Sequence, residues 1–141
     1  MKFWDASAVV PLLAVQGTTR LAQSIFSTDS FMSVWWATPI ECASALNRLE
    51  REGKIDAKGM VAANARLRGL GAIWNEVQAS ESLRESAERL VYAYNLRAGD
   101  ALQLAAAIAA SGDRPSALEI VCFDQRLLSA AHKVGFRVLS N

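Results

Sequence analysis

Hydrophobic positions gather in two kinds of segment, short apolar runs and longer amphipathic or apolar stretches. The short runs predict strands at residues 2–5, 31–37, 72–77, 117–124 and 136–140. The longer stretches predict helices at residues 6–14, 18–27, 38–53, 56–71, 80–96, 99–112 and 125–135. Strands separated by helices predict an α/β fold, with a mostly parallel central sheet of about five strands flanked by helices.

The strongest helix signals stand in residues 38–53. Thr38 is a suitable N-cap, and Gly53 lies just beyond the end of the segment. Glu41 follows the cap by three residues, at the position of the returning half of a capping box. Residues 99–112 are apolar on nearly every side, which predicts a helix deep in the domain.

Composition narrows the class of protein. With 141 residues, of which 52% are hydrophobic, the chain suits one domain spanning residues 1–141. Cys42 and Cys122 lie far apart, which argues against a disulfide framework or a zinc site and suits a reducing compartment. The net charge of +1 gives no general basic field. No segment approaches the roughly 18 apolar residues of a membrane span, so we expect a cytoplasmic protein without membrane contact.

Four acidic residues occupy the junctions between these elements. Asp5 and Asp124 each end a predicted strand and precede a helix. Glu41 and Asp100 lie in the first turns of their helices. Because the carboxyl ends of parallel strands meet at one edge of a sheet, we expect the four acids to face the same crevice.

Each of these acids also has a structural interpretation. The three aspartates could be N-caps, and Glu41 could complete a capping box with Thr38. Taken singly, these interpretations stay open. If the four carboxylates lie together, however, each pair about 5 Å apart repels by about 3 kcal/mol at an effective dielectric of about 20. A cluster of four therefore requires either protons or a cation.

The donor chemistry indicates which cation would suit such a cluster. Ligation by oxygen alone suits Mg²⁺ or Mn²⁺ and not zinc, which prefers nitrogen and sulfur. The only histidine, His132, lies late in a predicted helix beside Lys133, where a surface position is expected. A site built on two histidines is therefore excluded by count.

Four segments of the chain resemble, in order and spacing, the acidic motifs of PIN-domain ribonucleases, and in particular of VapC-type toxins. The segments are FWDASAVV, TPIECASALNRL, LRAGDALQLAAAIA and IVCFDQRLLSAAHKVGFRVL, and together they span the chain. The resemblance implies a PIN-like fold. It also implies a divalent-metal-dependent endoribonuclease that hydrolyses phosphodiester bonds in RNA, as the toxin of a type II, VapBC-like toxin–antitoxin pair.

The resemblance also implies the site residues and the partners. The catalytic and metal-binding residues would be the four acids, Asp5, Glu41, Asp100 and Asp124, with Mg²⁺ or Mn²⁺ as cofactor. Ser7 would supply a supporting hydrogen bond. The partners would be the RNA substrate, a VapB-like antitoxin and a second copy of the chain in a homodimer.

Two positions depart from the family pattern. Cys122 stands where the family often has Ser or Thr, and Gln103 stands where it frequently has His. We expect Cys122 to weaken one hydrogen bond of the site and the hold on Asp124. Neither change removes a carboxylate, so the chain should be an active member.

Basic residues near the motifs are candidates for contacts with RNA phosphates. They are Arg48, Arg51, Lys54, Arg97 and Arg126. Surface pairing with acids such as Glu50 and Glu52 is the alternative for them. Trp35 or Trp36 could stack on a base, but adjacent strand residues face opposite ways, so at least one should lie in the core.

Three other functions compete with the nuclease. A haloacid-dehalogenase-type phosphatase would need a second Asp where the chain has Ser7, and a phosphoacceptor domain would need a Lys after a late strand. The main alternative is a non-catalytic RNA- or protein-binding module that retains the PIN-like fold. RNA cleavage that depends on a divalent metal would separate the nuclease from this module.

Overall fold

The computed structural model describes residues 1–141 and contains one five-stranded sheet. The strands are β1 (Lys2–Trp4), β2 (Met32–Trp35), β3 (Asn75–Val77), β4 (Glu119–Val121) and β5 (Arg137–Leu139). They lie in the order β3-β2-β1-β4-β5, and every neighbouring pair is parallel. The predicted α/β fold with a parallel central sheet is therefore confirmed.

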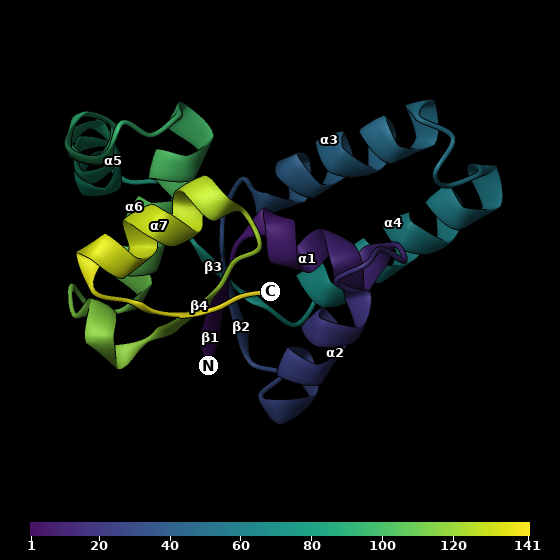
Figure 1. The fold of residues 1–141 in the computed structure, drawn as a ribbon, viewed down its shortest axis with the longest axis horizontal. Helices are drawn as coiled ribbons and strands as arrows, with labels where there is room; N and C mark the ends of the chain where they lie inside the picture. The colour runs from purple at the N-terminus through teal and green to yellow at the C-terminus, as the bar shows by residue number, and fades with distance from the viewer.

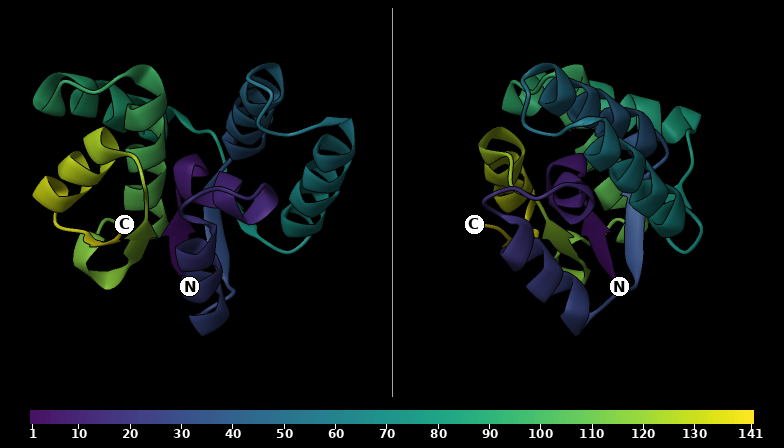
Figure 2. Two further views of the ribbon diagram at one scale, coloured as in Figure 1. Left: turned by 45° about the vertical axis from the view of Figure 1, so that its right-hand side comes forward. Right: turned by 90° about the vertical axis from the view of Figure 1, so that its right-hand side faces the viewer.

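Helices cover both faces of this sheet. They are α1 (Ala6–Leu13), α2 (Thr19–Thr28), α3 (Thr38–Arg51), α4 (Ala57–Gly71), α5 (Glu81–Tyr94), α6 (Ala98–Ala110) and α7 (Gln125–Val134), with a 3-10 turn at Pro115–Ala117 before β4. Figure 1 shows α5, α6 and α7 on one side of the sheet and α1 to α4 on the other. In Figure 2, α3 and α4 lie side by side. None of these helices is long and apolar enough to cross a membrane.

Alternating strand residues supply the two halves of the core. Phe3 and Ile120 are fully buried in the cluster that includes residues of α5, α6 and α7. The next residue of each strand, Trp4 and Val121, is fully buried in the cluster formed with α1 to α4. Since successive strand side chains point to opposite faces, one sheet divides the apolar interior into two layers.

The strand order changes direction beside β1. From β1 the chain first builds β2 and β3 to one side, and later β4 and β5 to the other. The amide of Asp5, directly after β1, donates to the carbonyl of Val121 at the end of β4, over 3.0 Å. In open parallel sheets, ligands bind outside the carboxyl ends of the strands at such a reversal. The fold thus places Asp5 at the expected crevice.

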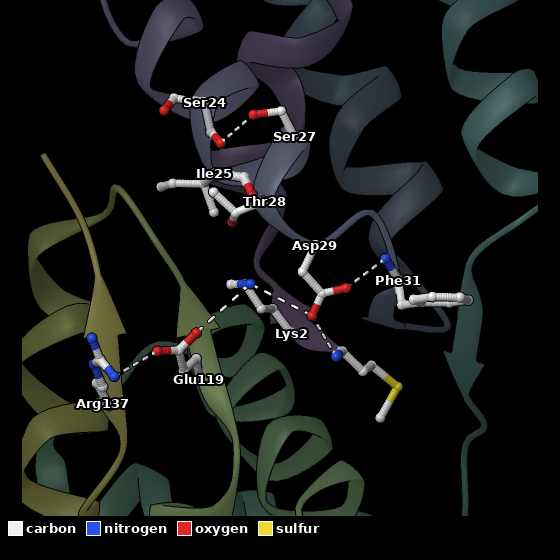
Figure 3. A network of polar contacts seen from close by, with 10 residues as sticks. Lys2, Ser24, Ile25, Ser27, Thr28, Asp29, Phe31, Glu119 and Arg137 are labelled. Carbon is white, nitrogen blue, oxygen red and sulfur yellow. Dashed lines mark hydrogen bonds and ion pairs between the residues drawn. The ribbon is translucent and has the colours of Figure 1, made fainter.

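A network of paired charges lies at the opposite, amino-terminal edge of the sheet (Figure 3). The ammonium group of Lys2 is 3.5 Å from Asp29 and 3.8 Å from Glu119. Glu119 also pairs with Arg137 at 3.0 Å, and Asp29 with the amino terminus of Met1 at 2.5 Å. Each carboxylate here faces at least one cation.

Several predicted boundaries were wrong by a few residues. Thr38 is the first residue of α3 and not its N-cap, which is Ala37 without a side-chain hydrogen bond. The predicted strand at residues 31–37 is limited to β2, and the one at 72–77 to β3. The latter is shorter because the backbone of residues 72–74 still donates to the last turn of α4.

Candidate active site

Asp5 is the most deeply buried of the four acids, with 5% of its surface exposed. It is the N-cap of α1, where its Oδ2 atom accepts hydrogen bonds from the amide of Ser7, at 3.0 Å, and from the Ser7 hydroxyl. No protein group donates to its second oxygen. Burial raises the pKa of Asp5 above its ordinary value, Ser7 partly offsets this, and the charges of Asp100 and Asp124 raise it further. Asp5 is thus a cap and also a carboxylate under electrostatic strain.

Ser7 and Cys122 surround the bound oxygen of Asp5. The Ser7 hydroxyl accepts a hydrogen bond from the amide of Phe123 over 2.9 Å, which links the start of α1 to the segment after β4. The Cys122 sulfur lies 3.7 Å from Asp5 Oδ2 and 3.4 Å from the carbonyl oxygen of Asp124. Cys122 therefore contacts the carboxylate of Asp5 and not that of Asp124. Cys122 holds Asp124 only through a weak sulfur hydrogen bond to its backbone carbonyl, and the weaker hold on Asp124 stays a prediction.

Glu41 does not form the capping box that the sequence left open. It lies in the first turn of α3, and its Oε2 atom accepts a hydrogen bond from Gln103 Nε2 of α6 over 3.2 Å. Burial raises the pKa of Glu41 to about 7; the Gln103 amide opposes this rise, and the charges of Asp5 and Asp100 add to it. The Glu41 side chain therefore reaches across the sheet edge to another helix.

Asp100 is not an N-cap either. It is the third residue of α6, whose N-cap is Arg97, and no protein group donates a hydrogen bond to its carboxylate. Burial and the charge of Asp124 raise the pKa of Asp100, while Arg97 and Arg126 lower it. Its carboxylate is therefore free of any structural role in capping.

For Asp124, as for Asp5, the capping interpretation is confirmed. Its Oδ1 atom accepts hydrogen bonds from the amides of Arg126 at 3.0 Å and Leu127 at 3.1 Å, at the start of α7. Its other oxygen accepts none. The cap fixes the side chain and leaves half of the carboxylate available.

The structure brings the four acids into one electrostatic neighbourhood. Asp5 is influenced by Asp100 and Asp124, and Glu41 by Asp5 and Asp100. The donor set, four carboxylates with uncommitted oxygens, fits a hard divalent cation such as Mg²⁺ or Mn²⁺. No three His, Cys, Asp or Glu side chains lie close enough together to form a ready-made ligand group. The carboxylates lie close enough to influence one another electrostatically, but they are not arranged as a complete group of metal ligands.

Two open hollows extend from the acids, and each is lined by a basic residue that the sequence singled out. One, of about 410 Å³, is lined by Ser7, Glu41 and Asp124 together with Arg48, Gln16 and Thr18 among others. The other, of about 610 Å³, is lined by Asp100, Arg97 and Arg126 with Tyr94, Asn95, Leu96 and Ser129. Cationic side chains therefore flank the acids on two sides.

The remaining basic candidates lie farther along the surface. Lys54 and Arg48 line a further hollow of about 720 Å³, but Lys54 is also paired with Glu52 at 3.1 Å. Arg51 is exposed and lines none of the hollows described here. The surface-pairing alternative thus applies to Lys54 and not to Arg48, which has no ion-pair partner.

The two adjacent tryptophans differ in exposure, although their rings meet edge to face with centroids 6.4 Å apart. Trp35 is buried, with 5% of its surface exposed, and packs in the core beside α6. Trp36 is 49% exposed. Only Trp36 is available for stacking on a base.

Sequence reasoning missed one residue of this site, Gln103. The sequence marks Gln103 only as a departure from a family pattern and Thr38 only as a possible cap, yet Gln103 contacts both Thr38 and Glu41. The available signal was spacing, because Gln103 follows Asp100 by three residues and so lies on the same face of α6. Its partners, more than 60 residues earlier, could not be read from that spacing.

Known proteins resemble this chain in fold and in sequence. No family model matches the chain. Among solved structures, the crystal structure of FitAcB from Neisseria gonorrhoeae superposes with a TM-score of 0.66 over 99% of this chain and 96% of that one, at 16% identity. The structure of FitAB bound to an IR36 DNA fragment superposes with a TM-score of 0.67 over 99% of this chain and 94% of that one, also at 16% identity. These likenesses support the fold.

Sequence relatives carry the assignment further. The chain is 31% identical over 137 residues to Ribonuclease VapC45 of Mycobacterium tuberculosis (strain CDC 1551 / Oshkosh), covering 96% of this chain and 92% of that protein. Identity and coverage are the same for Ribonuclease VapC49 of Mycobacterium tuberculosis (strain ATCC 25618 / H37Rv). The chain therefore belongs to the VapC family of PIN-domain ribonucleases.

Proposed function

We propose that the protein is a divalent-metal-dependent endoribonuclease and the toxin of a VapBC-like toxin–antitoxin pair. Family membership supports ribonuclease activity. The observation that carries the metal dependence is the set of like charges at the sheet reversal, where Asp5 and Glu41 have raised pKa values and uncommitted oxygens. A divalent cation would relieve this repulsion.

The metal site would be formed by the four acids, Asp5, Glu41, Asp100 and Asp124. When bound there, Mg²⁺ or Mn²⁺ would activate water for attack on a phosphodiester and neutralise the charge that develops on the phosphate. The chain's own contribution is orientation: Ser7 fixes Asp5, Gln103 fixes Glu41, and the amides of α7 fix Asp124. Asp100 has no such restraint.

The RNA backbone would run past the four carboxylates and along the two hollows beside them. On one side Arg48 lies in the hollow that contains Glu41 and Asp124, and on the other Arg97 and Arg126 lie beside Asp100. Guanidinium groups grip phosphate oxygens in a bidentate manner, so these three are the proposed phosphate contacts. We assign Lys54 and Arg51 a smaller part, since Lys54 is paired and Arg51 lies outside these hollows.

The decisive experiment compares Asp5→Asn with the parent in cleavage of a single-stranded RNA, with Mn²⁺, with Mg²⁺ and with EDTA. Asparagine is as good an N-cap as aspartate, so this variant keeps the start of α1 and removes only the charge. Asp113→Asn is the matched control, because Asp113 is exposed and has a left-handed backbone that asparagine tolerates. We expect metal-dependent cleavage by the parent and the control, and none by Asp5→Asn.

The second candidate is the non-catalytic binding module. It predicts tight RNA binding without cleavage in any metal, and equal binding by the parent and Asp5→Asn. Equal cleavage by parent and Asp5→Asn would instead show a nuclease whose site lies elsewhere. The same assay therefore distinguishes the three outcomes.

We further propose a VapB-like antitoxin and a homodimer as the protein partners, in the cytoplasm. The chain offers several exposed large apolar side chains for such contacts: Val15, Phe31, Trp36, Ile40, Val61, Ile73 and Tyr92. Leu46 and Leu49 of α3 are buried and are not available for such contacts. Co-purification with the product of a neighbouring small gene, followed by light scattering, would test both assemblies.

A further inference from the structure

Gln103 is an unusual residue for its place in the fold. It is 1% exposed and lies on α6 among buried apolar neighbours, including Leu104, Ala106 and Ala107. An unbranched apolar side chain such as methionine would fill the same space without placing an amide in the core. Packing alone therefore does not explain why this position carries an amide.

The hydrogen bonds of this amide point to that reason. Its Nε2 atom donates to Glu41 Oε2 over 3.2 Å and to Thr38 Oγ1 over 3.3 Å. Its carbonyl oxygen is buried and has no partner. A buried polar atom without a partner costs about 1–3 kcal/mol, so the amide is held in an orientation that serves Glu41 at a cost to the fold.

The contact also joins two parts of the molecule that otherwise pack apart. Helix α6 belongs to the core layer on one face of the sheet, and α3 to the layer on the other. The side-chain hydrogen bonds between these helices both start at Gln103. Since Gln103 lies one turn after Asp100, it ties the helix that bears Asp100 to the acid borne by α3.

We propose that Gln103 is a positioning residue for the metal site, and that it acts by fixing the carboxylate of Glu41 toward Asp5 and Asp100. This inference rests on the proposed function. Gln103 contacts no substrate and is not itself a ligand. The same Nε2 atom also donates to Thr38, which is fully buried and is not one of the four acids.

The test measures Mn²⁺ binding by isothermal titration calorimetry, without RNA, in four variants. Gln103→Met keeps the length and volume of the side chain and removes the donor. Thr38→Val is the matched control, because it removes the other hydrogen-bond partner of Gln103 and leaves the contact with Glu41. Glu41→Ala is combined with Gln103→Met to ask whether Gln103 acts through Glu41. Thermal unfolding of each variant checks the fold, and Gln103→Leu replaces Gln103→Met if that variant does not fold.

We expect Gln103→Met to weaken Mn²⁺ binding about tenfold, as removal of an orienting hydrogen bond at a metal site does, and Thr38→Val to change it less than about twofold. In the Glu41→Ala background, adding Gln103→Met should change binding less than about twofold, because nothing remains to be positioned. Equal binding by Gln103→Met and the parent, or an equal loss in both backgrounds, would overturn the proposal. If the parent neither binds Mn²⁺ nor cleaves RNA, the proposed function fails and the role of Gln103 with it.

Discussion

The two edges of the sheet treat the same residue type in opposite ways. At the amino-terminal edge, hydrogen bonds from the Met1 amine and the Phe31 amide, with the nearby charge of Lys2, lower the pKa of Asp29 to about 2. At the carboxyl-terminal edge, burial and neighbouring acids raise the pKa of Asp5. Asp29 has cations for partners, whereas Asp5 has only hydrogen-bond donors and other carboxylates. The carboxylate of Asp29 is therefore paired with cations, whereas the carboxylate of Asp5 is not.

This difference separates structural charges from functional ones better than burial does. Lys2 is more deeply buried than Glu41, Asp100 and Asp124, yet it stands between Asp29 and Glu119 and pairs with both. Perturbed carboxylates without a cation mark candidate sites because folding stability alone would favour their removal. Asp5 and Glu41 meet that criterion, and the pKa of Asp100 at the same edge is raised although Arg97 and Arg126 lie nearby.

The largest expected effect comes from neutralising one aspartate at each edge. Asp5→Asn should lower metal-dependent RNA cleavage at least about a hundredfold, since metal ions contribute several kcal/mol to such reactions. Asp29→Asn should leave cleavage unchanged and lower the melting temperature, because the amino terminus loses its partner and Lys2 loses one of its two. Cleavage rates and thermal unfolding of both variants check this. Loss of cleavage in Asp29→Asn, or full cleavage by Asp5→Asn, would contradict the proposed difference between the two edges of the sheet.

The next effect is the dependence of stability on pH without metal. Unfolded Glu41 releases its proton near its ordinary pKa of 4.5, whereas folded Glu41 keeps it up to about 7. Stability should therefore fall, by about 1–3 kcal/mol, as pH rises from about 4.5 through 7. Asp29 acts only in more acidic solution, because its folded pKa is about 2.

Thermal unfolding in EDTA between pH 5.5 and 7.5 measures this trend. The melting temperature of the parent should rise as the pH falls, and the rise should be smaller in Glu41→Gln. Saturating Mn²⁺ should stabilise the folded protein most at the higher pH, where the acids are ionised. A melting temperature that falls with acidity over this range would contradict the account.

A smaller effect is expected from the support beneath Asp5. Ser7→Ala removes the hydroxyl that donates to Asp5 Oδ2 and that accepts from the Phe123 amide. We expect cleavage to fall about tenfold, which is typical when an orienting partner of a metal ligand is removed. Ser27→Ala, at an exposed position of α2, is the control, and kinetic constants for both variants decide the matter. An unchanged rate in Ser7→Ala would show that Asp5 is fixed by other contacts.

The smallest effect concerns the cationic hollows. Arg48→Ala should raise KM for RNA by about two- to fivefold, corresponding to one exposed ionic contact of about 0.5–1 kcal/mol. Arg51→Ala, on the same helix but outside the hollows, should leave KM unchanged. Initial rates at several RNA concentrations and two ionic strengths separate them. Equal KM values for the two variants would show that Arg48 does not make the proposed contact with RNA.

Local features were predictable from the sequence where a single segment decides them. Ser80 caps α5 through its hydroxyl, and the stripe of Leu83, Ala87 and Leu90 faces the core, as periodicity predicts. Gly53 lies beyond α3 with a left-handed backbone. The order of strands and helices follows from the same kind of pattern.

Features decided by distant segments were not predictable. Thr38 has the side chain of a cap, but its hydroxyl accepts from Gln103 instead, 65 residues later. The capping box at Glu41 failed for the same reason, since Gln103 binds its carboxylate. The sequence placed the four acids at one edge by topology, whereas which oxygens stay uncommitted depends on contacts between helices.

Binding of Mn²⁺ at pH 7.5 by isothermal titration calorimetry tests the central claim most directly, with the parent, Asp5→Asn and Lys2→Met compared at equal ionic strength. The account predicts that the parent and Lys2→Met bind Mn²⁺ alike, because Lys2 belongs to the paired edge, and that Asp5→Asn loses this binding. Equal binding by the parent and Asp5→Asn would show that the acids at the carboxyl-terminal edge do not form a metal site.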